Sequence, residues 1–174
     1  MKIQQPGAHL DHMLRQTRMH HMQLSVMADL KANALMTISA VMLTFSAPFI
    51  AREQFKHAVI VLMIFSLSTI VLAMFAVMPS TPIRIRKFEP ADVGHPHFNL
   101  LFFGSFARMD YAQFEAAMEE VMNDPSKTYE AQIREIYTLG IFLATKKYRL
   151  LRLAYLAFAT GLFLSGTVLV AGVL

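Results

Sequence analysis

Three long stretches without a charged residue dominate the hydropathy pattern of this 174-residue chain. They cover residues 32–51, 58–78 and 153–174. An α-helix needs about 20 apolar residues to cross a hydrocarbon layer of about 30 Å, and a charge at the bilayer centre costs about 2.5–3.5 kcal/mol. Each stretch is therefore predicted to be a transmembrane helix.

Prolines mark the ends of two of these stretches. Pro48 lies near the end of the first, and Pro79 and Pro82 follow the second, where proline ends a helix at least cost. Only residues 52–57 separate the first two stretches, which predicts a tight turn in an antiparallel hairpin. About 30 residues with several charges precede the first stretch, so a cleavable signal peptide is not expected.

The distribution of positive charge predicts the orientation in the membrane. Of the 16 Lys and Arg residues, the hairpin turn contains only Arg52 and Lys56, and the other 14 lie before residue 32 or between residues 79 and 152. Segments rich in Lys and Arg stay in the cytoplasm. Both of these segments are therefore predicted to be cytoplasmic, in a multi-pass protein of the cell inner membrane.

The cytoplasmic segments have a helical pattern. Residues 9–31 contain no Gly or Pro and predict an amphipathic helix that enters the first span. Asp110 and Gln113 have the spacing of a capping box and begin a short helix, and Asn123-Asp124-Pro125 ends it. The next helix is predicted to continue unbroken into the third span.

Two further segments lack a helical pattern. Residues 83–94 contain or border several Pro and Gly residues and predict a loop. The apolar run Phe98–Phe106 is too short to span a bilayer and fits a strand or a buried turn.

The predicted fold is thus an all-α membrane protein with three transmembrane helices and a small cytoplasmic helical bundle. Its parts are an N-terminal cytoplasmic helix over 1–31, a transmembrane hairpin over 32–78, a cytoplasmic helical segment over 79–152 and a third transmembrane helix over 153–174. In the third span Ala157, Gly161 and Ser165 are spaced by four residues, which favours close helix packing, either within one chain or between copies.

The composition supports a membrane class and excludes several kinds of chemistry. Hydrophobic residues make up 55% of the chain and charged residues only 16%. The chain has no cysteine, which excludes disulfides, thiolate metal sites and cysteine nucleophiles. Phosphate-binding glycine loops and the GxSxG motif are absent as well. We therefore expect no enzyme activity and no cofactor.

The basic charge balance does not require a nucleic-acid partner. Positive residues gather beside the second and third spans, where anionic lipid headgroups attract them. We therefore expect the lipid bilayer as a partner and no nucleic acid. The two clusters are Arg84, Arg86 and Lys87, and Lys146, Lys147, Arg149 and Arg152.

Histidines near the N-terminus suggest a metal site only weakly. His9, His12, His20 and His21 lie near Asp11, but no pattern of the HExxH type occurs, and a polar helix face explains them better. The same holds for His95 and His97 in the predicted loop. No metal site is expected.

Polar and cationic residues near the predicted cytoplasmic membrane face are interleaved with aromatic rings, as in sites for anionic nucleotides. The polar group comprises Arg15, Asp29, Lys31, Asn33, Arg108, Lys146, Lys147 and Arg149, and the rings are Phe103, Tyr137 and Tyr148.

Several short motifs, in this order, resemble the Pycsar effector family of the PycTM type. They are the Ala28–Asn33 turn before the hairpin, the Phe98–Gly104 run, Tyr137, and Lys147–Arg152 before the last span. The resemblance extends over nearly the whole chain, from about residue 9 to residue 170.

The resemblance implies a bacterial antiphage effector. A partner pyrimidine cyclase makes cyclic CMP or cyclic UMP upon infection, the effector senses this activating ligand, and the inner membrane is impaired so that growth stops. A homo-oligomer is expected, because only several copies could build a pore from so few spans. The ligand-binding residues carried over from the matching motifs are Asp29, Lys31, Asn33, Gly104, Tyr137, Lys147 and Tyr148.

Other roles remain open for these residues and for the chain. Asp29 and Lys31 can anchor a helix end, Gly104 can make a turn, and the two tyrosines can fill a core or lie at the membrane interface. The alternative function is a constitutive membrane scaffold whose cytoplasmic bundle docks a protein partner. An ion channel or transporter is disfavoured because the three predicted spans contain no Asp, Glu, Lys, Arg or His.

Overall fold

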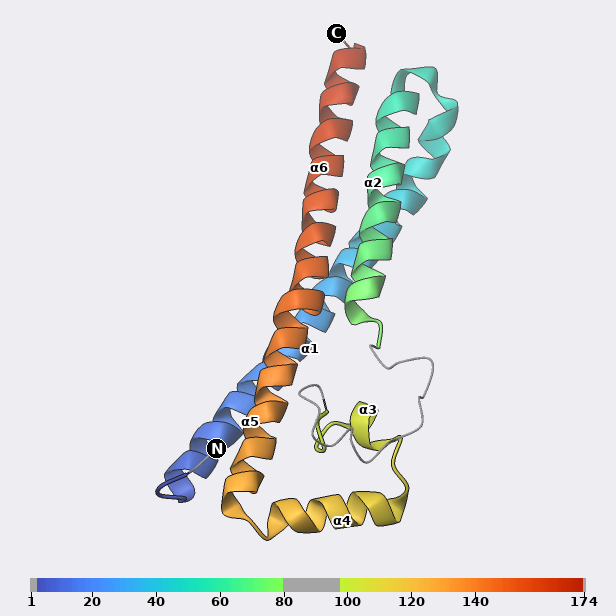
Figure 1. The fold of residues 1–174 in the computed structure, drawn as a ribbon. Helices are drawn as coiled ribbons and strands as arrows, with labels where there is room; N and C mark the ends of the chain where they lie inside the picture. The colour runs from blue at the N-terminus through green and yellow to red at the C-terminus, as the bar shows by residue number, and fades with distance from the viewer. Residues whose placement is uncertain (1–2, 80–97, 174) are drawn as a thin grey trace. The chain divides into compact units, whose positions relative to one another are not determined.

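A computed structural model describes residues 3–79 and 98–173, and in these residues the chain is helical without a strand (Figure 1). The all-α prediction is confirmed for this part of the chain. The elements are α1 (Ala8–Ser46), the 3₁₀ segment η1 (Ala47–Ala51), α2 (Glu53–Val77), α3 (Phe103–Phe106), α4 (Tyr111–Met122), α5 (Pro125–Phe142), the π-helical segment η3 (Leu143–Lys147) and α6 (Tyr148–Val173).

In the described part of the chain, three helical stretches are long and apolar enough to cross a membrane. They are Ala8–Ala51, Glu53–Val77 and Pro125–Gly172. The first and the third are much longer than the roughly 20 residues that a bilayer needs. The prediction of three membrane helices is confirmed in length and composition, and the cytoplasmic location of the other segments stays a prediction.

The chain forms two compact units. Unit 1 consists of Met1–Gln23 and Pro79–Phe142, and unit 2 of Leu24–Met78 and Leu143–Leu174. Helix α1 contributes residues to both units, and so does the continuous helix formed by α5, η3 and α6.

Unit 2 has a core of small side chains where α1, α2 and α6 meet. Ala28, Ala32 and Leu35 of α1 are buried there with Ala73 of α2 and with two residues of α6, Leu151 and Ala154. Small residues let helix backbones approach closely, which is how helices associate in lipid. Large apolar side chains such as Phe45 and Phe163 are instead exposed on the outside, as lipid-facing residues are.

The spaced small residues of α6 pack against α2 of the same chain, and Figure 1 shows these two helices side by side. A Cβ atom at Gly161 would collide with the Phe65 side chain. The Ser165 hydroxyl donates a hydrogen bond of 2.9 Å to the Ala58 carbonyl. For Gly161 and Ser165, therefore, close packing within one chain explains the pattern.

The hairpin turn lies earlier than predicted. The chain reverses at η1 and Arg52, whereas the sequence predicted the turn over residues 52–57. Pro48 lies in the first turn of η1, and α2 already begins at Glu53. An acidic side chain is favourable in the first turn of a helix, and Lys56 forms an ion pair of 3.2 Å with Glu53. The charges marked the start of a helix and not a loop.

The interpretation of Ala28–Asn33 as a turn was wrong. These residues lie inside α1, which runs unbroken because it contains no Gly or Pro. Of the two alternatives for the Phe98–Phe106 run, the buried turn is correct. Phe98, Asn99 and Leu100 are buried, a turn follows, and the run ends in α3.

The short-range helix signals are confirmed. The Asp110 carboxylate accepts a hydrogen bond of 2.8 Å from the Gln113 backbone, and the Gln113 side chain accepts one of 3.1 Å from the Asp110 backbone. Asp124 accepts a bond of 2.8 Å from the Ser126 backbone at the start of α5. The predicted continuation of this helix into the third span also holds, although η3 interrupts the α-helical pattern. The predicted loop over 83–94, the cations Arg84, Arg86 and Lys87, and His95 and His97 lie outside the described residues.

Candidate functional site

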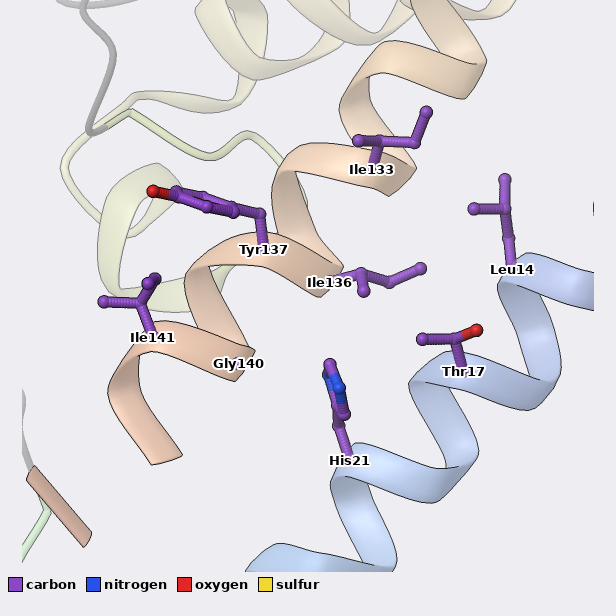
Figure 2. A pocket seen from close by; sticks show the side chains of 8 residues that line it. All are labelled: Leu14, Thr17, His21, Ile133, Ile136, Tyr137, Gly140 and Ile141. Atoms are coloured by element: carbon purple, nitrogen blue, oxygen red, sulfur yellow. The ribbon is translucent and has the colours of Figure 1, made fainter. Parts of the chain in front are cut away.

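A pocket lies between α1 and α5 in unit 1 (Figure 2). Its volume is about 420 Å³ and its wall is mostly aliphatic. Small-molecule sites typically have volumes of about 300–1,000 Å³. The lining residues are Leu14, Thr17 and His21 from α1 and Ile133, Ile136, Tyr137, Gly140 and Ile141 from α5.

Polar contacts tie α1 to α5 beside this pocket. The Tyr129 hydroxyl donates a hydrogen bond of 2.7 Å to the Asp11 carboxylate and accepts one of 3.3 Å from the Gly7 backbone. The bond to Asp11 raises the pKa of the Tyr129 phenol, because the carboxylate favours the protonated form. An ion pair of 3.1 Å joins Arg18 to Glu135.

Among the described residues that line the pocket, His21 is the only one with an imidazole. Figure 2 shows its ring extending from α1 toward α5 near Gly140. Its Nδ1 atom is buried and has no hydrogen-bond partner among the described residues. A Cβ atom at position 140 would lie only 3.3 Å from the Cε1 atom of His21. The ring can therefore pack this closely against α5 because Gly140 has no side chain.

Two of the predicted ligand residues belong to unit 1. Tyr137 lines the pocket, but its side chain is 67% exposed and leaves α5 on a different side from Ile136 (Figure 2). Gly104 lies in α3, where a Cβ would collide with the Phe102 ring. The structure therefore supports a packing role for Gly104. The Phe103 ring beside it is more than half exposed.

Unit 2 brings three predicted ligand residues together. The Lys147 ammonium donates hydrogen bonds of 2.8 Å to Asp29 and 2.7 Å to Ser25. The Tyr148 hydroxyl donates one of 3.1 Å to the Leu24 carbonyl. All of these bonds join the segment 24–29 of α1 to the end of η3 and the start of α6. Lys147 and Tyr148 thus serve intramolecular contacts.

The burial of these charged groups is unequal. The Lys147 side chain is only 7% exposed, and that of Asp29 is 39% exposed. One oxygen of Asp29 pairs with Lys147, while the other is buried without a partner among the described residues. A buried ammonium is stable only when it is paired and hydrogen-bonded, so Asp29 and Ser25 explain how Lys147 can be buried.

Lys147 is also the last residue of η3. π-Helical turns are rare and occur often at functional sites. The hydrogen bonds from Lys147 to Asp29 and Ser25 tie this turn to α1. This feature was not predicted, since helical periodicity alone does not reveal an inserted residue.

The remaining two predicted ligand residues stand apart from this network. Lys31 and Asn33 are exposed on α1, and the described part of the chain offers neither side chain a hydrogen-bond partner. Within the described residues, no group of three or more His, Cys, Asp or Glu residues is placed to hold a metal ion.

Sequence reasoning missed two residues of these sites. The sequence placed His21 on one face of the N-terminal helix with Leu14 and Thr17 and offered it as a possible metal ligand, but it did not predict that this face lines a pocket. Ser25 lies four residues after His21, but a lone serine carries no signal that it accepts a bond from a lysine 122 positions away.

The comparison with protein families identifies the chain. A family model described as PycTM, Pycsar effector protein domain, matches residues 12–173, which is nearly the whole chain. No curated protein and no solved structure matches the chain.

Proposed function

Because this chain belongs to the PycTM family of Pycsar effector proteins, and is therefore a membrane effector of antiphage defence, we propose that it senses a cyclic pyrimidine nucleotide and then impairs the inner membrane. The ligand is cyclic CMP or cyclic UMP, and the result is that an infected cell stops growing. The family match over residues 12–173 is the observation that carries the proposal.

The arrangement of the helices supports a coupling between sensing and membrane damage. Helix α1 and the continuous helix α5–η3–α6 each have one part in unit 1 and another in unit 2. A ligand shifts a conformational equilibrium only by its difference in affinity for the two states. A nucleotide that prefers one arrangement of α1 against α5 would therefore act directly on two helices that enter the bilayer.

The uncharged stretches 32–51, 58–78 and 153–174 offer no transport site within one chain, since they contain no Asp, Glu, Lys, Arg or His. A homo-oligomer is therefore part of the proposal. Of the seven expected ligand residues, Lys31, Asn33 and Tyr137 have exposed side chains that a ligand can reach. Asp29, Lys147, Tyr148 and Gly104 would act mainly by keeping the helices in place.

Calorimetry and a leakage assay test this function. Purified full-length protein in detergent should bind cyclic CMP or cyclic UMP, and cyclic AMP and cyclic GMP serve as controls. Cells that express the protein and make the same pyrimidine nucleotide should take up a membrane-impermeant dye. If neither pyrimidine nucleotide binds or causes leakage, the proposal fails and a constitutive scaffold becomes the better explanation.

Reporter fusions test the proposed placement in the inner membrane. A fusion after Gln54 should report the periplasm, and a fusion after Lys127 the cytoplasm, because 14 of the 16 Lys and Arg residues lie outside the hairpin turn. Reporters on the same side of the membrane would contradict the three-span topology.

A further inference from the structure

The pocket between α1 and α5 combines aliphatic side chains with an imidazole ring. Leu14, Ile133 and Ile136 provide aliphatic surface, and His21 provides the imidazole. Thr17 is also in the wall, but its hydroxyl proton is already donated to the Met13 carbonyl at 2.9 Å. His21 is the side chain from α1 in this pocket that has a buried nitrogen without a hydrogen-bond partner among the described residues.

The state of His21 is unfavourable without a ligand. A neutral imidazole has one donor and one acceptor nitrogen, and a buried polar atom without a partner destabilises the folded chain. The Nδ1 atom of His21 is such an atom within the described part of the chain. Because Gly140 has no side chain, the ring packs directly against α5, with only 3.3 Å between Cε1 and the position of a Cβ.

A cation lies next to the pocket wall. Arg18 follows Thr17 on α1 and pairs with Glu135, which precedes Ile136 on α5. The Arg18 side chain is 53% exposed, whereas that of Glu135 is 15% exposed. A solvent-exposed guanidinium can leave its carboxylate partner for a phosphate, whose oxygens match its planar fork of donors.

We infer that this pocket binds the activating nucleotide, with the pyrimidine base in the aliphatic cleft, its hydrogen-bonding edge on His21 and its cyclic phosphate on Arg18. The inference rests on the proposed function. The volume of about 420 Å³ falls in the range of small-molecule sites. The polar edge of a pyrimidine pairs with an imidazole, and its apolar faces suit Leu14 and Ile136.

The decisive variant is His21→Leu. Leucine has a side chain of similar bulk and removes the unpartnered nitrogen, so the folded chain should be at least as stable as the wild type. The affinity for cyclic CMP or cyclic UMP should fall by about tenfold or more. The reason is that the polar edge of the base would lose its hydrogen bond to His21 inside the pocket. Calorimetry on the full-length protein in nanodiscs measures the affinity, and thermal unfolding measures the stability.

His20→Leu is the matched control, because His20 is exposed and does not line the pocket. It should bind as the wild type does. Arg18→Gln is a second test variant, at an exposed position where the chain should still fold normally. The variant should bind the nucleotide more weakly, and its affinity should depend less on the salt concentration. If the wild type binds no cyclic pyrimidine, the proposed function fails. If the wild type binds but His21→Leu and Arg18→Gln bind equally tightly, the function stands and the assignment of this pocket is overturned.

Discussion

Lys147 offers the sharpest test of how unit 2 is held together. Its ammonium is buried and bonded to Asp29 and Ser25 of α1, at the point where the π-helical segment ends and α6 begins. We consider the variant Lys147→Met, which removes the charge and keeps a long unbranched side chain. The remaining Asp29 carboxylate then has no cationic partner among the described residues.

The expected loss of stability follows from the burial of the two partners. Removing one partner of a fully buried ion pair costs about 3–5 kcal/mol. Lys147 is 7% exposed, but Asp29 is 39% exposed, so water can partly solvate the carboxylate that remains. We therefore expect the free energy of unfolding to fall by about 2 kcal/mol, below the fully buried range. The variant Asp29→Asn leaves the more deeply buried Lys147 ammonium without its carboxylate and should cost at least as much.

Unfolding of the purified protein by SDS in mixed micelles, followed by circular dichroism, measures this loss. Arg149→Met is the control, because Arg149 is exposed on the same helix and its loss should cost about 0.5 kcal/mol or less. The double variant of Asp29 and Lys147 should be non-additive by about 1 kcal/mol or more. Equal losses for Lys147→Met and Arg149→Met, or strict additivity, would refute the reasoning.

Two further predictions concern α6 and α5. Gly161→Leu should push α6 away from Phe65 of α2 and lower the free energy of unfolding by about 1–3 kcal/mol or more. Gly166→Ala is the control, because no atom lies within 4 Å of its Cβ, and it should leave the free energy of unfolding almost unchanged. Equal effects of the two variants in the SDS titration would contradict this packing. The bond to Asp11 raises the pKa of Tyr129 above its ordinary value of 10.0, so it stabilises the fold below that pH and is lost as the pH rises through the raised pKa. Thermal midpoints between pH 8 and pH 11 should therefore fall more steeply for the wild type than for Tyr129→Phe, and parallel curves would contradict the prediction.

The candidate site was harder to predict than the helices, and Lys147 shows why. Its position beside other cations predicted a lipid-facing or ligand-facing charge, yet the structure buries it in an ion pair within the chain. Asp29 lies 118 positions earlier in the sequence. Helical spacing indicates which residues share a face of one helix, but it carries no information about the register between two helices.

The sequence by itself determined the features that depend on neighbouring residues. Uncharged runs of about 20 residues predict helices that can cross a bilayer, because a charge buried in the membrane is costly. The capping box of Asp110 and Gln113 predicts the start of α4, because both partners lie within one helical turn. Only the tertiary structure decided that the small residues of α6 face α2 and that His21 packs on Gly140. It also decided that hydrogen bonds from Lys147 hold the π-helical turn against α1. These depend on how helices distant in sequence align, and that alignment is a balance of many packing contacts that no local pattern records.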